Sequence, residues 1–235
     1  MRRDAGFADS LFTFLGAEEV RSFDASSYEG ASDIHDFNAR IDPEYHRQFD
    51  LVLDAGSLEH VFLATTALQN CMEMVRVGGH LIVMSPANNY LGHGFYQFSP
   101  EFYFRSLSDE NGFEIRLACV FEGHADPLWY EVIDPAVFGR RSEATTRRPT
   151  TLAVVARKTA DVSPFARPPQ ESDYVEAWKT EGSLVVHRHA RLVETVRGYV
   201  PERSRSLYRW ARSFLSRRRY RPEIFRPRGV PPHYR

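Results

Sequence analysis

The chain has 235 residues, of which 43% are hydrophobic and 26% are charged, as is ordinary for a soluble globular protein. This length suits one domain with an appendage. No run of about eighteen apolar residues occurs, and the first residues lead into no signal-peptide segment, so we expect a cytoplasmic protein without a membrane span.

The formal net charge of −1 hides a division between two parts of the chain. Residues 187–235 hold 14 Arg, no Lys and 3 Glu, a net charge of +11, which leaves −12 for residues 1–186. The sequence therefore predicts an acidic body that bears a basic tail.

The first predicted elements are a helix and two short strands. A helix is predicted over residues 7–15, because its apolar positions recur every three or four residues and Gly16 can end it. Short strands are predicted over residues 20–24 and, more weakly, 33–36, and each finishes at an acidic residue.

The next stretch is a strand that leads into a helix, and the rest of the chain is organised around it. Residues 51–53 have the length and branching of a buried strand, which stops at Asp54 before an Ala-Gly-Ser turn. Apolar positions over residues 58–75 then take a helical spacing. Ligands of open α/β sheets bind beyond the carboxyl ends of the strands, so we expect Asp54, Glu59 and His60 to face such a crevice.

The remaining segments continue the alternation of strands and helices. In chain order they are a strand at 77–84 broken by Pro86, an aromatic loop at 88–98, a helix at 100–110, and strands at 113–121 and 151–156. The predicted organisation is an α/β domain over 1–157 with an insertion at about 122–149, a Pro-rich linker over 158–183, and a basic helical tail over 184–235. The tail shows helical stripes at 185–200 and 207–215.

The two cysteines give no sign of a disulfide or a metal site. Cys71 falls in a predicted helix and Cys119 in a predicted strand, where free buried thiols are common. No Cys or His spacing is typical of a zinc site, so no structural metal is expected.

Taken together, these segments resemble the class I S-adenosylmethionine-dependent methyltransferases, most clearly over residues 51–61 and 75–83. In that family a seven-stranded sheet has the order 3-2-1-4-5-7-6. The resemblance implies a Rossmann-like three-layer α/β sandwich, with residues 51–54 as strand 4 and 77–84 as strand 5. It covers about residues 7–157.

The resemblance also implies a cofactor, S-adenosylmethionine, and the residues that hold it. An acidic residue ending strand 2 binds the cofactor ribose in this family, and one after strand 3 lies beside the adenine. The implied cofactor-binding residues are Asp24, Ala25, Asp36, Phe37, Asp54, Ala55 and Gly56. The implied reaction is methyl transfer to a small-molecule or glycan-related acceptor, with Glu59, His60 and His93 as candidate catalytic residues.

One expected part of the family pattern is missing from the sequence. Strand 1 and its Gly-x-Gly-x-Gly loop should precede the first helix, where only six residues are available. Strand 1 is central in that sheet, and unpaired interior edges are unfavourable. We therefore expect either a truncated or misassigned start or a degraded copy, and a non-catalytic binding or scaffold module is the alternative function.

Each candidate residue also has a purely structural interpretation. Asp24 can cap a turn, and Asp36 can serve an ordinary loop. His60 can be a base or substrate contact, or simply a packed or exposed histidine, and His93 can contact substrate or lie in a solvent-facing turn. The basic tail can pack on the acidic body, on a partner protein or on an anionic membrane; no nucleic acid partner is expected.

Overall fold

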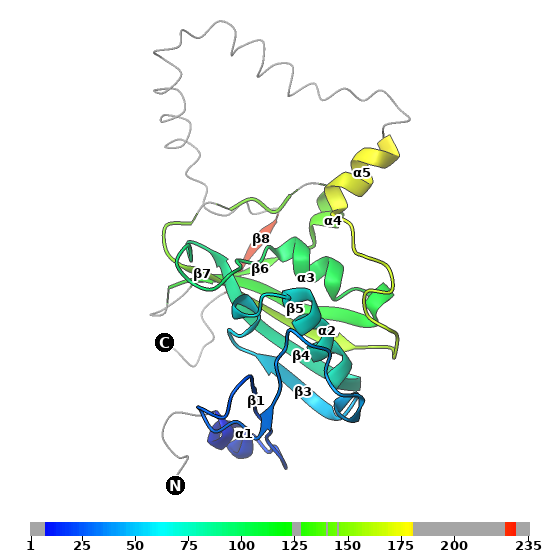
Figure 1. Ribbon diagram of the computed structural model, residues 1–235. Coiled ribbons are helices and arrows are strands. Elements are labelled where there is room, and N and C mark those ends of the chain that lie inside the picture. Colours follow the sequence, from blue (N-terminus) through cyan, green and yellow to red (C-terminus); the bar gives the residue numbers. More distant parts are fainter. Residues whose placement is uncertain (1–7, 124–127, 140, 145, 181–223, 229–235) are drawn as a thin grey trace, which may run out of the picture.

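The computed structural model describes residues 8–123, 128–139, 141–144, 146–180 and 224–228 (Figure 1). The helices are α1 (Asp9–Phe14), α2 (Ala64–Met74), α3 (Pro100–Ser106), α4 (Pro135–Phe138) and α5 (Ser172–Thr180). The strands are β1 (Phe23–Asp24), β2 (Asp33–Ile34), β3 (Phe49–Asp54), β4 (Val75–Asn88), β5 (Phe113–Glu122), β6 (Trp129–Val132), β7 (Thr150–Lys158) and β8 (Phe225–Arg228). Short 3-10 turns lie at η1 (Pro43–Tyr45), η2 (Leu58–His60) and η3 (Asp109–Asn111).

The main sheet has six strands in the order β3-β4-β7-β5-β6-β8. β3 and β4 are parallel, whereas β7 is antiparallel to both of its neighbours. The order β3-β4-β7-β5 matches strands 4-5-7-6 of the predicted sheet, since these strands follow one another in the chain as 4, 5, 6 and 7. The predicted Rossmann-like α/β fold class is therefore confirmed.

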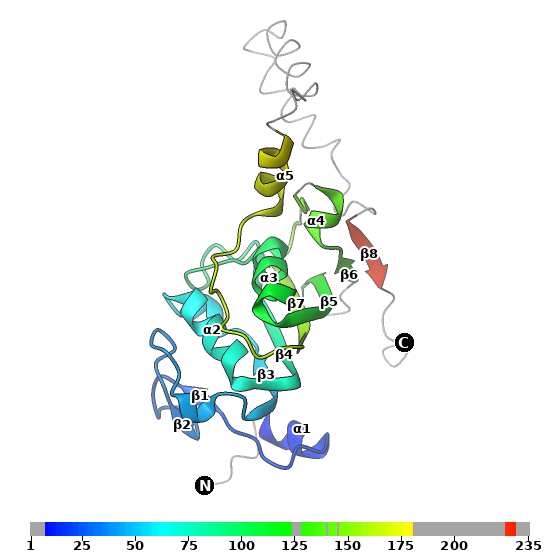
Figure 2. The same ribbon diagram turned by 90° about the vertical axis from the view of Figure 1, so that its right-hand side faces the viewer.

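The core lies between the sheet and helices α2 and α3, which cover the same face of it (Figure 2). Side chains alternate along the central strands. Leu81 of β4 and Val154 of β7 are buried, while the residues directly before and after each of them are only half-buried. Leu68 of α2 and Tyr103 of α3 are fully buried against this face. Burying each such side chain contributes about 1.5–3 kcal/mol, which holds the strand ends in place around the candidate site.

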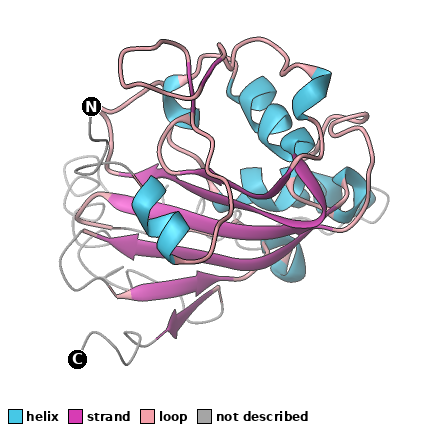
Figure 3. Cartoon of the chain, turned by 90° about the horizontal axis from the view of Figure 1, so that it is seen from below, coloured by secondary structure: helices cyan, strands magenta, loops and turns pink. Residues whose placement is uncertain are grey.

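The first two strands do not join the main sheet. β1 and β2 form a separate two-stranded parallel sheet, and the Phe23 ring packs edge-on against Phe49 with centroids 6.0 Å apart. Among the described residues, no strand pairs with the outer edge of β3 (Figure 3). Residues 51–53 lie in a strand as predicted, but the prediction that this strand is buried is wrong. Leu51 and Leu53 are each 39% exposed, because they alternate with Val52, which packs against the core, and so point to the opposite face of the sheet.

Helix α1 is shorter than the predicted helix over residues 7–15, and none of its residues is buried. The exposed fraction of Phe14, for example, is 86%. The apolar spacing therefore predicted a helix correctly, but no described part of the chain buries the apolar side of α1.

Strand β4 continues beyond the proline that was expected to break it. Pro86 lies opposite Thr151 of β7, and the register shifts between Pro86 and Asn88. A proline has no N–H to donate to the ladder, and this irregularity lets the strand pass it. The Pro86 carbonyl instead accepts a hydrogen bond from the N–H of Phe98 at 2.7 Å, which fixes the return of the aromatic loop.

The regions outside the central strands contribute two further strands and a helix. The insertion supplies β6, and residues 224–228 supply β8, whose Phe225 is buried and pairs with Val132. Helix α5 lies within the range predicted as a Pro-rich linker. The tail helices predicted at 185–200 and 207–215 lie outside the described residues. No helix in the described ranges has the length and apolar character needed to cross a bilayer.

Candidate functional site

The candidate site is built at the carboxyl end of β3, where Asp54 is the last residue of the strand. Its side chain is buried, and Oδ1 accepts a hydrogen bond from the N–H of Ser57 at 3.1 Å. Oδ2 is also buried but has no hydrogen-bond partner among the described residues. Burial, together with the nearby Glu59 charge, raises the pKa of Asp54 to about 6.

Glu59 follows in the 3-10 turn η2 and is even more deeply buried, with an exposed fraction of 2%. Its Oε1 lies 3.5 Å from Nε2 of His93, whereas Oε2 has no partner in the part of the chain that the structure describes. The turn at Gly56 brings the chain close enough that a Cβ there would lie 3.3 Å from Oε1. Gly56 has a φ of 111°, which favours glycine.

The approach to Glu59 differs from the sequence-based expectation. Glu59 and His60 were expected in the first turn of one long helix, but η2 ends at His60 and α2 begins only at Ala64. Asn38 from the preceding loop accepts a hydrogen bond from the N–H of Leu63 at 2.9 Å, which satisfies the backbone at this break.

The aromatic loop after β4 is hydrogen-bonded to η2 and to the residues that follow it. The N–H of Phe95 donates to the Glu59 carbonyl at 2.7 Å, and the Tyr96 hydroxyl donates to the Phe62 carbonyl at 2.7 Å. Gly94 has a φ of 66°, and a Cβ at this position would lie 2.7 Å from the Glu59 carbonyl oxygen. Only glycine therefore allows this close approach, which sets the position of His93 next to it in the chain.

The three predicted catalytic residues lie together. The rings of His60 and His93 are 4.8 Å apart between centroids and meet edge to face. One potential ligand atom from each of Glu59, His60 and His93 lies within 4.8 Å of the others. Glu59 is buried while both histidines are exposed, so a buried carboxylate lies beside two imidazoles that solvent can reach.

The predicted ribose-binding residues lie elsewhere. Asp24 ends β1, and its Oδ1 accepts hydrogen bonds from the Ser26 N–H at 2.7 Å and hydroxyl at 3.2 Å, while Ala25 is exposed. The neighbouring Phe23 packs on Phe49, the first residue of β3. Asp54 lies five residues beyond Phe49 on β3, which is about 17 Å along the strand at a rise of about 3.3 Å per residue. The structure therefore does not bring Asp24 and Asp54 together.

The predicted adenine-side residues follow β2. Asp36 is exposed and accepts hydrogen bonds from the N–H and side-chain amide of Asn38, which lower the pKa of its carboxyl. Phe37 is half-buried, contacts Phe23 edge-on at 6.3 Å and packs against the core. Asn38 links this loop to the start of α2, so Asp36 has a closer structural connection to the Glu59 turn than Asp24 has.

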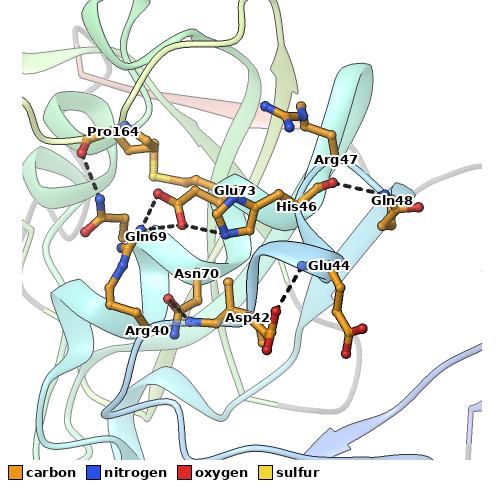
Figure 4. Close-up of polar contacts among 12 residues, drawn as sticks. Arg40, Asp42, Glu44, His46, Arg47, Gln48, Gln69, Asn70, Glu73 and Pro164 are labelled. Atoms are coloured by element: carbon orange, nitrogen blue, oxygen red, sulfur yellow. Dashed lines mark hydrogen bonds and ion pairs between the residues drawn. The ribbon is translucent and has the colours of Figure 1, made fainter.

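A polar cluster at the opposite, amino end of the strands was not anticipated from the sequence. Glu73 of α2 forms an ion pair with Arg40, and its carboxylate oxygen Oε2 lies 3.4 Å from Nε2 of His46 (Figure 4). The N–H of Arg47 donates to the Glu73 carbonyl at 2.8 Å. These residues come from two segments about thirty positions apart, and no motif in the sequence joins them.

A cavity of about 300 Å³ adjoins this cluster and is lined by His46, Arg47, Glu73, Lys158, Asp161, Val162 and Ser163. Lys158 is buried there and donates from Nζ to the Met72 carbonyl at 3.0 Å. Burial lowers the pKa of Lys158. Arg47 pairs with Asp161 and Glu73 with Arg40, and the cavity lies at the end of the sheet where open α/β folds do not bind ligands.

Comparisons with known proteins find methyltransferases among solved structures. The chain is similar to a putative methyltransferase from Bacillus halodurans C-125, with 12% identity and a TM-score of 0.44 over 67% of this chain and 89% of that one. It is also similar to the antibiotic-resistance methyltransferase Kmr, with 17% identity and a TM-score of 0.33 over 55% of this chain and 62% of that one. No protein-family model and no curated protein sequence matches the chain.

Proposed function

We propose that the chain transfers a methyl group from S-adenosylmethionine to an oxygen or nitrogen of a small-molecule or glycan-related acceptor. The observation that carries the proposal is Asp54 at the carboxyl end of β3. Its carboxylate is buried, and Oδ2 has no partner in the described part of the chain. A buried carboxylate oxygen without a donor is unfavourable, so a ligand that supplies donors or positive charge is the natural complement.

The chemistry of these residues fits the cofactor. S-adenosylmethionine carries a sulfonium, an ammonium and a ribose diol, which are the cationic and donor groups that buried carboxylates accept. The bound cofactor supplies an activated methyl group. Asp54, with Ala55 and Gly56 at the turn, would hold it at the strand end, and Asp36 and Phe37 remain the proposed residues for the adenine. The position of Asp24 and Ala25 near the amino end of β3 does not support the ribose role expected for them.

The acceptor side is assigned to the two exposed imidazoles. His93 lies 3.5 Å from Glu59, which orients its ring, and His60 stands beside it. A neutral imidazole can remove a proton from an acceptor hydroxyl or amine as the methyl group is transferred. The loop that carries His93 is fixed to η2, so this base would be held in position and not recruited on binding.

Calorimetric titration with S-adenosylmethionine tests the proposal. We expect saturable binding to the folded protein, weakened in Asp54→Asn, because the substitution removes the buried negative charge but keeps the size of the side chain. Asp50→Asn is the matched control: Asp50 lies on the same strand at its exposed amino end and pairs with Arg76. Absence of binding at millimolar cofactor, or an equal effect of both variants, would refute the assignment.

The second candidate is a non-catalytic methyltransferase-like binding or scaffold module. It is favoured by the separate β1–β2 sheet, which leaves Asp24 near the amino end of β3. The same titration discriminates between the two. A folded protein that binds neither S-adenosylmethionine nor S-adenosylhomocysteine would favour the module.

A further inference from the structure

We propose that Glu59, His60 and His93 form a binding site for a divalent transition-metal cation, of which Zn²⁺ is the representative. The sequence gives no metal signature, because His60 and His93 are 33 residues apart. The fold joins them, since η2 follows β3 and the His93 loop follows the neighbouring strand β4.

The distances suit a metal centre. Zinc bonds to histidine nitrogen and carboxylate oxygen at about 2.0–2.1 Å, so two ligand atoms in a tetrahedral site lie roughly 3.3 Å apart. His93 Nε2 and Glu59 Oε1 are 3.5 Å apart, close to this separation. All three ligand atoms fall within 4.8 Å of one another, so a modest rotation of the exposed His60 ring completes the set.

Burial of Glu59 is the second observation that points to a cation. The exposed fraction of Glu59 is only 2%, yet Oε2 has no hydrogen-bond partner among the described residues. Its other oxygen, Oε1, lies 3.5 Å from Nε2 of His93. A bound cation would compensate the buried charge that this arrangement leaves unmatched.

The ligand types decide which metals fit. Two imidazoles and one carboxylate suit zinc and its neighbours in the first transition series, whereas calcium and magnesium prefer shells built from oxygen. The protein supplies three ligands, of which the two histidines are exposed to solvent, so a coordination position stays open. Catalytic zinc sites have this pattern, whereas structural zinc sites are closed.

The site lies on the acceptor side of the proposed methyl-transfer centre, and its role there depends on that proposed function. The histidines would then bind the cation instead of accepting a proton, and an acceptor hydroxyl bound to the cation would lose its proton more readily. Metal binding itself does not depend on methyl transfer, and it is measured separately.

The test is zinc titration of the chelator-treated full chain, in competition with a chromophoric chelator. We expect one zinc per chain at this site, and affinity at least about tenfold weaker in His93→Ala and in His60→Ala, since loss of one ligand exceeds the effect of losing an outer-shell contact. Both histidines are exposed, so circular dichroism should show that each variant stays folded. Glu59→Gln, which keeps the buried volume, should weaken zinc binding as well.

His46→Ala is the matched control, because His46 faces Glu73 at 3.4 Å in the same kind of histidine–carboxylate pair but belongs to no three-residue cluster among the described residues. It should retain zinc affinity. Absence of zinc binding by the wild-type chain, or equal binding by wild type and His93→Ala, would overturn the proposal. So would loss of binding in His46→Ala alone.

Discussion

Replacing Asp54 by Asn should change the pH dependence of stability in a way that depends on its burial. The pKa of Asp54 is raised from its usual value of 3.8 to about 6 in the folded protein, mainly by burial. Asn keeps the shape of the side chain and an oxygen that can accept the hydrogen bond from Ser57, but it does not titrate. The variant therefore removes one ionisation and little packing.

The sign follows from proton linkage. Between pH 3.8 and about 6 the folded state retains the Asp54 proton while the unfolded chain loses it, so wild-type stability falls as the pH rises. The stability from the protonated carboxyl is fully present below pH 3.8 and is lost above about pH 6. The difference between the two pKa values corresponds to about 3 kcal/mol. Asp54→Asn should thus gain up to about 3 kcal/mol relative to wild type between pH 4 and pH 7.

Urea unfolding of both proteins at a series of pH values measures this difference directly. Titrations that the two proteins share cancel in the comparison, apart from the coupling between Asp54 and Glu59. Val52→Ala, a non-titrating change on the same strand, should lower stability by an amount that does not vary with pH. A difference between Asp54→Asn and wild type that stays constant from pH 4 to pH 7 would show that the carboxyl is not buried in this way.

Three further substitutions and one control test the packing around the site. Gly94→Ala should weaken zinc binding by about tenfold or more, because its Cβ would press on the backbone oxygen of Glu59 in η2. Gly92→Ala, with open space around its Cβ, should leave zinc binding unchanged. The chelator competition measures both variants. Tyr103→Phe should lower the free energy of unfolding by about 1–2 kcal/mol, measured in urea, because it removes a buried 2.9 Å hydrogen bond. Leu68→Ala, in the fully buried face of α2, should cost about 2–5 kcal/mol in the same assay, and a cost below 1 kcal/mol would contradict the packing described.

The sequence predicted the central strands well because their signals are local. Apolar runs bounded by turn residues located β3, β4, β5 and β7, and Ser99 and Pro100 marked the start of α3, where the Ser99 hydroxyl accepts from the N–H of Phe102. The exposure of Leu51 and Leu53 could not be predicted in this way, because it depends on whether another element covers the face of the sheet toward which they point. Strand β8 was missed for a related reason: its pairing with β6 joins segments almost a hundred residues apart.

The candidate site was predicted in part. Asp54 ends β3, and Glu59 and His60 follow it within six residues, so their proximity could be inferred from that strand alone. The glycines on either side of His93 marked a tight loop. The contact between His93 and Glu59 required the parallel pairing of β3 with β4, which the family resemblance implied. The separation of Asp24 from Asp54 depends on how β1 packs against β3, and no local pattern in the sequence encodes this.

The cofactor proposal and the metal proposal share one corner of the fold, and two substitutions separate them. Asp54 ends the strand and belongs to the cofactor side, whereas His93 comes from the loop after β4 and contacts Glu59. Asp54→Asn should weaken S-adenosylmethionine binding and leave zinc binding within a few-fold of wild type, because Asp54 is not a ligand of the cluster. His93→Ala should do the reverse. If either variant abolished both S-adenosylmethionine binding and zinc binding while circular dichroism showed a folded protein, the division into a cofactor side and a metal side would be wrong. Asp54, Glu59 and His93 would then have to bind a single ligand.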